Sequence, residues 1–320
     1  MNSLLETSIK DIIKNYSSFF LNKKNVLGVG LGYKTIKNLE TNELSIHILV
    51  NKKVPLNNLY KKDVISKTFL GLKTDIIEIG LLQDNSITEI SSKEKKTSTH
   101  TSRIRPLKAG YSIGTAMSGI TGTLGAIVFD DVNTPYILSN NHILAGENKN
   151  KKGTLILQPG ASDGGFVKNN IVGKLYDFVS LSFEENSNKD IATTNIADCA
   201  IAKIDSNIDY NSNFKIFGKI RGVSKPVLRS EVFKIGRTTG YTNGFIKTIN
   251  ATLRYKSSYN GLYKTFSDLI ITTNMSYKGD SGSLLVNSEN KALGLLVGDN
   301  PLNSWFNPIE YILNVFNVHF

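Results

Sequence analysis

The sequence has a single cysteine, Cys199, and only seven prolines among 320 residues. One cysteine excludes a disulfide within the chain, which favours a reducing compartment such as the cytoplasm. No apolar run approaches the roughly 18 residues that a membrane-spanning helix needs. Charged residues interrupt the first 25 positions, where a secretion signal would be apolar. We therefore expect a cytoplasmic protein that is neither exported nor embedded in a membrane.

Residues that bind metals are also scarce, and nucleic-acid-binding motifs are missing. The only histidines are scattered along the chain, so we expect no metal and no cofactor: they are His47, His100, His142 and His319. The net charge is +11, and residues 1–108 hold 18 basic and 10 acidic residues against 20 and 17 in residues 109–320. No helix-turn-helix, RNA-binding strand motif or zinc finger accompanies this charge. A solvated basic surface therefore explains it better than a nucleic-acid partner.

What the chain does have is a small glycine-flanked turn before an apolar run. It reads Gly279-Asp280-Ser281-Gly282-Ser283 and precedes Leu284-Leu285-Val286. Glycines permit backbone angles that let neighbouring N–H groups converge on one point, as an oxyanion hole for acyl transfer requires. The same residue types are also ordinary in surface turns. The turn is therefore a candidate nucleophile site only if a base and an acid accompany it.

His142 is the best candidate for the base, because it ends the segment 136–142, a short apolar strand at 136–138 that runs into a polar corner. The other histidines are expected on the surface, with His47 on the outward face of an alternating strand. Asp198 opens an apolar strand, and a buried carboxylate there needs a partner such as an imidazole. A strand-start cap is the alternative role for Asp198, and Asp163, in a glycine-rich loop, is the rival acid.

The order His142, Asp198, Ser281 resembles that of the chymotrypsin-like serine peptidases, which carry these residue types on two β-barrels. Residues 235–244, which read IGRTTGYTNG, resemble a segment of bacterial α-lytic-type proteases. Further segments are similar to a bacterial branch of trypsin-like peptidases that has an extra N-terminal domain: residues 26–34, 112–114 with 122–125, 139–142 and 307–310.

The resemblance implies a serine endopeptidase that cleaves a protein or peptide substrate. Ser281 would be the nucleophile, His142 the general base and then acid, and Asp198 the residue that orients His142. The N–H groups of Gly279 and Ser281 would form the oxyanion hole. A substrate pocket would be lined by residues before the nucleophile and on the strand after it, namely Met275, Lys278, Val297, Gly298 and Asp299.

Three positions depart from the family pattern. Asn140 and Asn141 replace small residues before the histidine, and Ser283 replaces a glycine. Val297 stands where many relatives carry a serine whose hydroxyl supports the catalytic aspartate. These departures keep open a catalytically weak or inactive peptide-binding or scaffold module. A second alternative is a nucleic-acid-responsive protease with a basic N-terminal sensor.

The pattern of apolar residues predicts a mainly β fold, a chymotrypsin-like double β-barrel with a small N-terminal α+β domain and a C-terminal helix. We expect an accessory domain at 1–83, a Ser/Thr/Lys-rich linker at 84–108 and the protease domain at 109–320. The accessory domain is predicted to hold a helix at 3–20, strands at 26–34, 43–52 and 74–80, and a helical turn within 55–65. Later strands are predicted at 123–129, 136–138, 154–158, 231–235 and 269–273, and a helix from Pro308.

The accessory domain could be a folding aid that is removed, or a permanent adaptor that docks a partner or builds a homo-oligomer. The lack of an export signal favours the adaptor.

Overall fold

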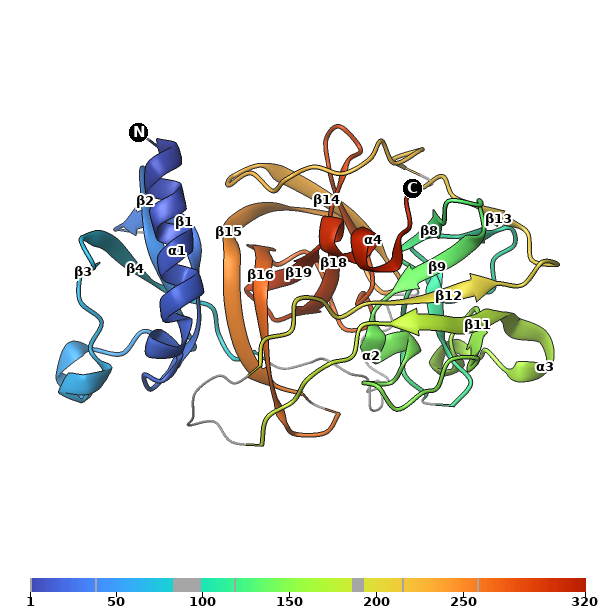
Figure 1. Ribbon diagram of the computed structural model, residues 1–320, viewed down its shortest axis with the longest axis horizontal. Coiled ribbons are helices and arrows are strands. Elements are labelled where there is room, and N and C mark those ends of the chain that lie inside the picture. Colours follow the sequence, from blue (N-terminus) through green and yellow to red (C-terminus); the bar gives the residue numbers. More distant parts are fainter. Residues whose placement is uncertain are drawn as a thin grey trace.

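The computed structural model describes residues 2–37, 39–82, 99–117, 119–185, 193–214, 216–257 and 259–320. Strands dominate, and two barrel-like sheets stand side by side, with the N-terminal helix and strands beyond the second barrel (Figure 1). These sheets confirm the expected mainly β fold class. Within the described ranges, no helix is both long and apolar enough to cross a membrane.

The first barrel is a seven-stranded sheet in the order β7-β6-β10-β11-β12-β9-β8. Strand β9 pairs with β8 on one side and β12 on the other, so the position of its C-terminal end is fixed from both sides. Two short helices, α2 (Asn141–Leu144) and α3 (Val167–Asn170), lie in the connections. The strands are β6 (Ser112–Thr115), β7 (Thr121–Thr123), β8 (Ala126–Phe129), β9 (Pro135–Ser139), β10 (Leu155–Leu157), β11 (Ile171–Phe178) and β12 (Ala200–Ile204).

The single strand expected at 123–129 is wrong, because the chain breaks between β7 and β8. The Gly125 N–H donates to the carbonyl oxygen of Leu138 at 2.9 Å. A Cβ on Gly125 would also collide with the carbonyl oxygen of Gly282. The break therefore lets the turn that carries Ser281 approach the first barrel closely.

The second barrel closes because β14 pairs with both β17 and β15. Helix α4 (Ile309–Phe316) follows its last strand and ends at Asn317, which adopts the left-handed conformation with φ 50°. In order around the barrel, the strands are β14 (Glu231–Gly236), β17 (Leu284–Asn287), β18 (Ala292–Asp299), β19 (Asn303–Pro308), β16 (Tyr263–Thr273) and β15 (Gly240–Lys256).

The N-terminal unit extends the sheet of the second barrel. Its strand β1 pairs antiparallel with the far half of β15, so the ten-stranded sheet continues through the unit to its edge. Helix α1 (Asn2–Leu21) buries Ile9, Ile12 and Ile13 on this sheet, as their spacing predicts. The strands are β1 (Val26–Ile36), β2 (Leu39–Val50), β3 (Thr68–Phe69) and β4 (Leu72–Glu78), with two 3₁₀ turns at Leu56–Asn58 and Lys61–Asp63.

One hydrophobic cluster runs through the N-terminal unit and the second barrel. It joins Ile46 and Ile48 of β2 with Ile246 of β15 and Phe306 of β19, all nearly inaccessible to solvent. A second cluster joins the first barrel with β17, β18 and α4. Both neighbours of the second barrel are therefore attached to it by shared cores.

Of the expected linker at 84–108, residues 84–98 lie outside the described part of the chain. From Thr99 the chain forms a 3₁₀ turn (Thr99–Thr101), and β5 (Leu107–Lys108) then pairs parallel with β13 (Tyr210–Asn211). The ring of His100 packs edge-on against Tyr111, with the ring centroids 4.6 Å apart.

The surface position expected for His47 is wrong. Its ring is buried against β1, which lies between β2 and β15: Nδ1 lies 2.9 Å from Thr248 Oγ1 of β15, and Nε2 lies 3.0 Å from the Tyr33 carbonyl oxygen of β1. Burial lowers the pKa of His47, because it disfavours the charged imidazolium. Both faces of β2 are covered from Leu44 to Val50, which the alternating pattern did not indicate.

The seam between β1 and β15 leaves no room for a side chain at Gly28. A Cβ there would lie 2.5 Å from the carbonyl oxygen of Thr252. We predict that Gly28→Ala lowers the free energy of unfolding by roughly 1–3 kcal/mol, measured by urea denaturation. The control Ile36→Ala, at the exposed end of β1, should stay within about 0.5 kcal/mol of the parent. Equal stability of the two variants would contradict this close packing.

Candidate active site

His142 lies on α2, at the end of a central strand of the first barrel. The two preceding asparagines hold this turn in place. Asn140 Nδ2 donates to the carbonyl oxygen of Asp198, and Asn141 Nδ2 donates to that of Val179, each at 2.7 Å. The unusual asparagine pair thus provides hydrogen bonds that fix where the histidine stands.

Asp198 is brought to His142 by the pairing of β12 with β9, in which Ala200 lies opposite Ser139. The carboxylate is fully buried. Its Oδ2 lies 2.6 Å from His142 Nδ1, and its Oδ1 accepts the backbone N–H of His142 at 3.1 Å. This two-point contact fixes the orientation of the imidazole ring.

The same carboxylate is held in its charged form. Burial alone would raise the pKa of Asp198, but the charge and hydrogen bonds of His142, with a smaller effect of the Lys264 ammonium, hold it below its ordinary value. The Asp198 N–H donates to Asn307 Oδ1 at 2.8 Å, which fixes the backbone as well. Asp198 can therefore stabilise a positive charge that forms on His142.

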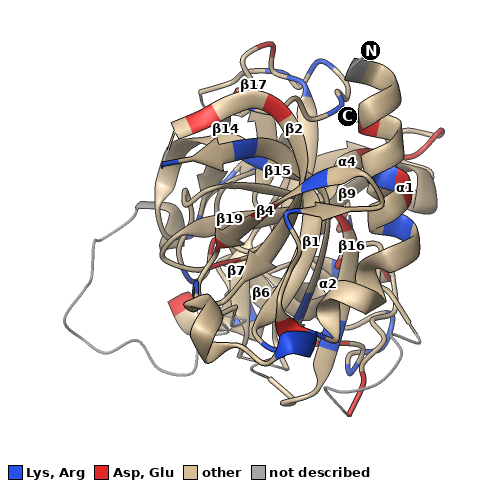
Figure 2. Cartoon of the chain, turned by 90° about the vertical axis from the view of Figure 1, so that its left-hand side faces the viewer, with Lys and Arg blue, Asp and Glu red and all other residues tan. Residues whose placement is uncertain are grey.

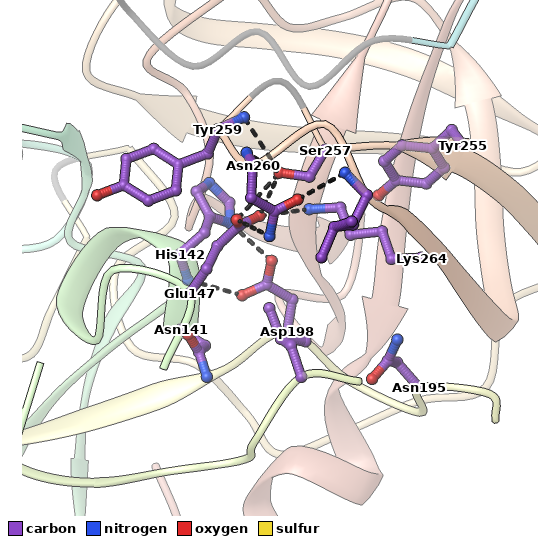
Figure 3. Close-up of polar contacts among 12 residues, drawn as sticks. Asn141, His142, Glu147, Asn195, Asp198, Tyr255, Ser257, Tyr259, Asn260 and Lys264 are labelled. Carbon is purple, nitrogen blue, oxygen red and sulfur yellow. Dashed lines mark hydrogen bonds and ion pairs between the residues drawn. The ribbon is translucent and has the colours of Figure 1, made fainter. Parts of the chain in front are cut away.

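A buried ion pair lies beside these two residues (Figure 3). Lys264 Nζ of β16 donates to Glu147 Oε1 at 3.1 Å, and both side chains are almost inaccessible to solvent. Ser257 Oγ donates to Glu147 Oε1 at 2.8 Å, and Asn260 Nδ2 donates to Glu147 Oε2 at 3.1 Å. Because Glu147 follows His142 by five residues, this network ties the end of the histidine turn to the second barrel.

Sequence reasoning missed this network, although it bears on the departure at Val297. The Val297 side chain is buried in a hydrophobic cluster of the second barrel and offers no hydroxyl. Lys264, by contrast, places a positive charge near Asp198. The only signal in the sequence was a lysine, Lys264, within a β-strand pattern. It does not identify Glu147, its partner 117 residues away.

Ser281 lies in a turn of the second barrel that contacts the first. The Thr123 N–H donates to the Ser281 carbonyl oxygen at 2.8 Å, and Thr123 Oγ1 donates to that of Gly279 at 3.0 Å. Gly279 and Gly282 have φ values of 97° and 91°, which residues with a side chain rarely adopt. The turn is thus fixed against β7, beside the break that precedes β8.

The Ser281 hydroxyl makes no hydrogen bond to any residue that the structure describes. The backbone of Ser281 lies close to α2: a Cβ on Gly122 would meet both the Ser281 carbonyl oxygen, at 2.8 Å, and the side chain of Ile143, the residue after His142. His142 and Asp198 are in direct contact, and the backbone of Ser281 lies beside the helix that carries His142.

Two N–H groups of the turn are available to a ligand. In the described part of the chain, those of Gly279 and Ser281 donate to no protein acceptor. The others are occupied: Asp280 donates to Tyr277, Gly282 to Leu296 and Ser283 to Asp280, each through a carbonyl oxygen at 2.9–3.0 Å.

The IGRTTG segment anchors the Asp280 side chain beneath the turn. Asp280 Oδ1 accepts the N–H groups of Thr238 and Thr239, and Oδ2 lies 3.1 Å from Lys234 Nζ. Lys234 and Asp280 are both fully buried. Burial lowers the pKa of Lys234, and the Asp280 charge partly offsets that effect. The rival acid, Asp163, pairs with Arg237 of this segment.

The expected pocket residues are divided between core and surface. Met275 is buried in the cluster shared with the N-terminal unit, and a Cβ on Gly298 would meet the Trp305 ring. Lys278 is half-buried, which lowers its pKa. Asp299 is buried, and it contributes to the lining of an open pocket of about 570 Å³ that Gly80 and Leu81 also line.

No set of three or more His, Cys, Asp or Glu side chains in the described ranges is arranged to hold a metal ion. Cys199 is buried next to Asp198, and burial raises the pKa of its thiol well above the ordinary value.

No family model and no curated protein matches the chain. Solved structures similar to it include a Nocardiopsis protease (17% identity, TM-score 0.47), Cellulomonas bogoriensis chymotrypsin (19%, 0.45) and Thermobifida fusca protease A (18%, 0.46). Each alignment covers 67% of this chain and 97% of the other. At such identities and scores the similarity carries no inference about activity, which has to come from the site.

The Glu147–Lys264 pair yields a test of stability. We predict that Lys264→Met lowers the free energy of unfolding by roughly 3–5 kcal/mol, because it leaves a buried carboxylate without its counter-charge. The double variant Glu147→Gln with Lys264→Met should recover most of this loss in urea denaturation. The exposed pair of Lys152 and Asp177 is the control, and Lys152→Met should cost less than about 1 kcal/mol. If Lys264→Met costs no more than this control, the pair does not anchor the histidine turn.

Proposed function

We propose that this chain is a serine endopeptidase that acts through an acyl-enzyme on Ser281. His142 Nε2 takes the proton of the Ser281 hydroxyl as Oγ attacks the carbonyl carbon of a peptide bond. The C–N bond then breaks, and the leaving amine takes that proton from His142. Water next gives a proton to His142 and attacks the ester, which releases the carboxylic acid and returns the proton to Ser281.

The developing oxyanion is proposed to bind the N–H groups of Gly279 and Ser281. Their lack of an acceptor in the described chain supports this role, because fixed donors that cost no reorganisation stabilise such a charge strongly.

The single observation that carries the proposal is the 2.6 Å contact between His142 and a fully buried Asp198, on the barrel against which the Ser281 turn is held. A buried carboxylate that aligns one imidazole nitrogen leaves the other to act as a base. The glycine angles and the two unoccupied donors are what a nucleophile turn requires.

Two observations favour the alternative of a peptide-binding scaffold with negligible turnover. Ser281 Oγ makes no hydrogen bond within the described residues, and Val297 gives Asp198 no hydroxyl. Catalytic hydrogen bonds are often formed only when substrate is present, so we favour the enzyme.

A fluorophosphonate probe separates the two functions. The parent protein should be labelled, and Ser281→Ala should lower the labelling rate by about 10⁴-fold or more, because the nucleophile is gone. The control Ser230→Ala, in an exposed turn, should label like the parent. Labelling that survives Ser281→Ala would exclude the proposed nucleophile, and a folded parent that takes no label would favour the scaffold.

For substrate binding we propose the region of Met275, Lys278, Val297, Gly298 and Asp299. Lys278 is the only one of these residues that is partly exposed, since Met275, Val297 and Asp299 are all buried. A library of peptides that varies the residue before the cleaved bond would show which side chain the region accepts, and cleavage without any preference there would argue against it.

We propose that the N-terminal residues remain attached as a permanent part of a cytoplasmic protein. The shared cluster, the β1–β15 pairing and the ion pair of Lys247 with Glu40 all support this. Basic and acidic residues are intermixed over this face of the molecule, which favours a docking or structural role over a nucleic-acid sensor (Figure 2).

The mass of the purified protein tests this retention. We expect an intact 35.3 kDa chain after prolonged incubation, both for the parent and for Ser281→Ala. An active parent that accumulates without its first 82 residues would contradict it, and comparison with Ser281→Ala would show whether the chain cuts itself.

A further inference from the structure

The two available N–H groups belong to peptide units whose carbonyl groups, those of Lys278 and Asp280, each accept a hydrogen bond. A trans peptide unit points its C=O and N–H in opposite directions. Whatever fixes the Lys278 carbonyl therefore fixes the Gly279 N–H, and whatever fixes the Asp280 carbonyl fixes the Ser281 N–H. The partners of these two carbonyls determine whether the oxyanion hole exists.

The Asp280 carbonyl is held from within the turn. It accepts the Ser283 N–H at 3.0 Å and the Ser283 hydroxyl at 2.5 Å. The departure from glycine at position 283 thus adds a second donor to this carbonyl.

The Lys278 carbonyl accepts a hydrogen bond from the turn that joins β14 to β15. Thr238 Oγ1 donates to it at 2.7 Å. A hydroxyl has one proton to donate, and Arg237 Nη1, at 3.0 Å from Thr238 Oγ1, donates to the same oxygen. The threonine proton is therefore directed to the carbonyl, and the guanidinium charge makes it a stronger donor.

The guanidinium is itself fixed by Asp163. Arg237 Nε donates to Asp163 Oδ2 at 2.6 Å and Nη2 donates to Oδ1, a two-point ion pair whose side chains are almost fully buried. The loop that carries Asp163 is in turn anchored on β7, because the Ser162 N–H donates to Thr121 Oγ1 at 3.1 Å.

We propose that Thr238, fixed by Arg237 and Asp163, is a positioning residue that keeps the Lys278–Gly279 peptide from flipping and so holds the Gly279 N–H in the oxyanion hole. The inference rests on the proposed peptidase function. In this proposal the candidate acid Asp163 does not orient His142. It supports the oxyanion hole indirectly, because it fixes Arg237, which in turn fixes Thr238. Without the Thr238 hydroxyl, the peptide is free to rotate about its neighbouring bonds and to withdraw its donor.

The test compares Thr238→Val, which keeps the shape and loses the hydroxyl, with Thr238→Ser, which keeps the hydroxyl. The measured quantity is the second-order rate of fluorophosphonate labelling, together with kcat and KM on a peptide that the parent cleaves. Thr238→Val should lower the labelling rate and kcat by about 10–100-fold, a part of what losing an oxyanion donor outright costs. KM should change little, and Thr238→Ser should restore the parent rate to within about threefold.

A structural role alone would not give this pattern. Thr154→Val is the matched control, since its hydroxyl also donates to a backbone carbonyl, that of Lys151, in an exposed turn. It should leave labelling unchanged. If Thr238→Val lowers the melting temperature markedly, Thr238→Ala with the Thr238→Ser rescue replaces it.

The outcomes distinguish the two proposals. A parent that labels on Ser281 while Thr238→Val labels equally fast overturns the positioning role and leaves the peptidase intact. A crystal structure of Thr238→Val in which the Gly279 N–H keeps its direction would also overturn it. A parent that does not label on Ser281 overturns the peptidase proposal itself.

Discussion

The site depends on the hydrogen bonds that Thr123 makes across the boundary between the two barrels. Its N–H and hydroxyl donate to the carbonyls of Ser281 and Gly279, so a residue of the first barrel fixes the turn of the second. The Arg237 N–H donates to the same hydroxyl at 2.9 Å. Because His142 and Asp198 belong to the first barrel, this one residue helps to set the position of the candidate nucleophile relative to its base.

Two buried ion pairs support the halves of the site separately. Lys234 and Asp280 lie under the serine turn, and Glu147 and Lys264 lie beside the histidine turn. Burying charges is costly unless the pairing is complete, so these pairs do more to specify one arrangement than to stabilise the fold. Both support rigid geometry around groups that would change protonation during the proposed reaction.

The fold class and the contact between His142 and Asp198 could be anticipated from the sequence, because short motifs at strand ends carry them. The seam between β1 and β15 could not, because it joins segments more than two hundred residues apart and alternation alone placed His47 outside. Lys264 and Thr123 were missed for the same reason. A lysine or threonine in a strand gives no sign of the distant partner that determines its role.

A crystal structure of the protein after reaction with a peptidyl phosphonate would test the central claim most directly. We predict a covalent bond from phosphorus to Ser281 Oγ, with one phosphonyl oxygen about 2.7–3.1 Å from the nitrogens of Gly279 and Ser281, and His142 facing the adduct with its Asp198 contact unbroken. Phosphorus bound to another residue, or an oxygen that points away from both N–H groups, would contradict the account.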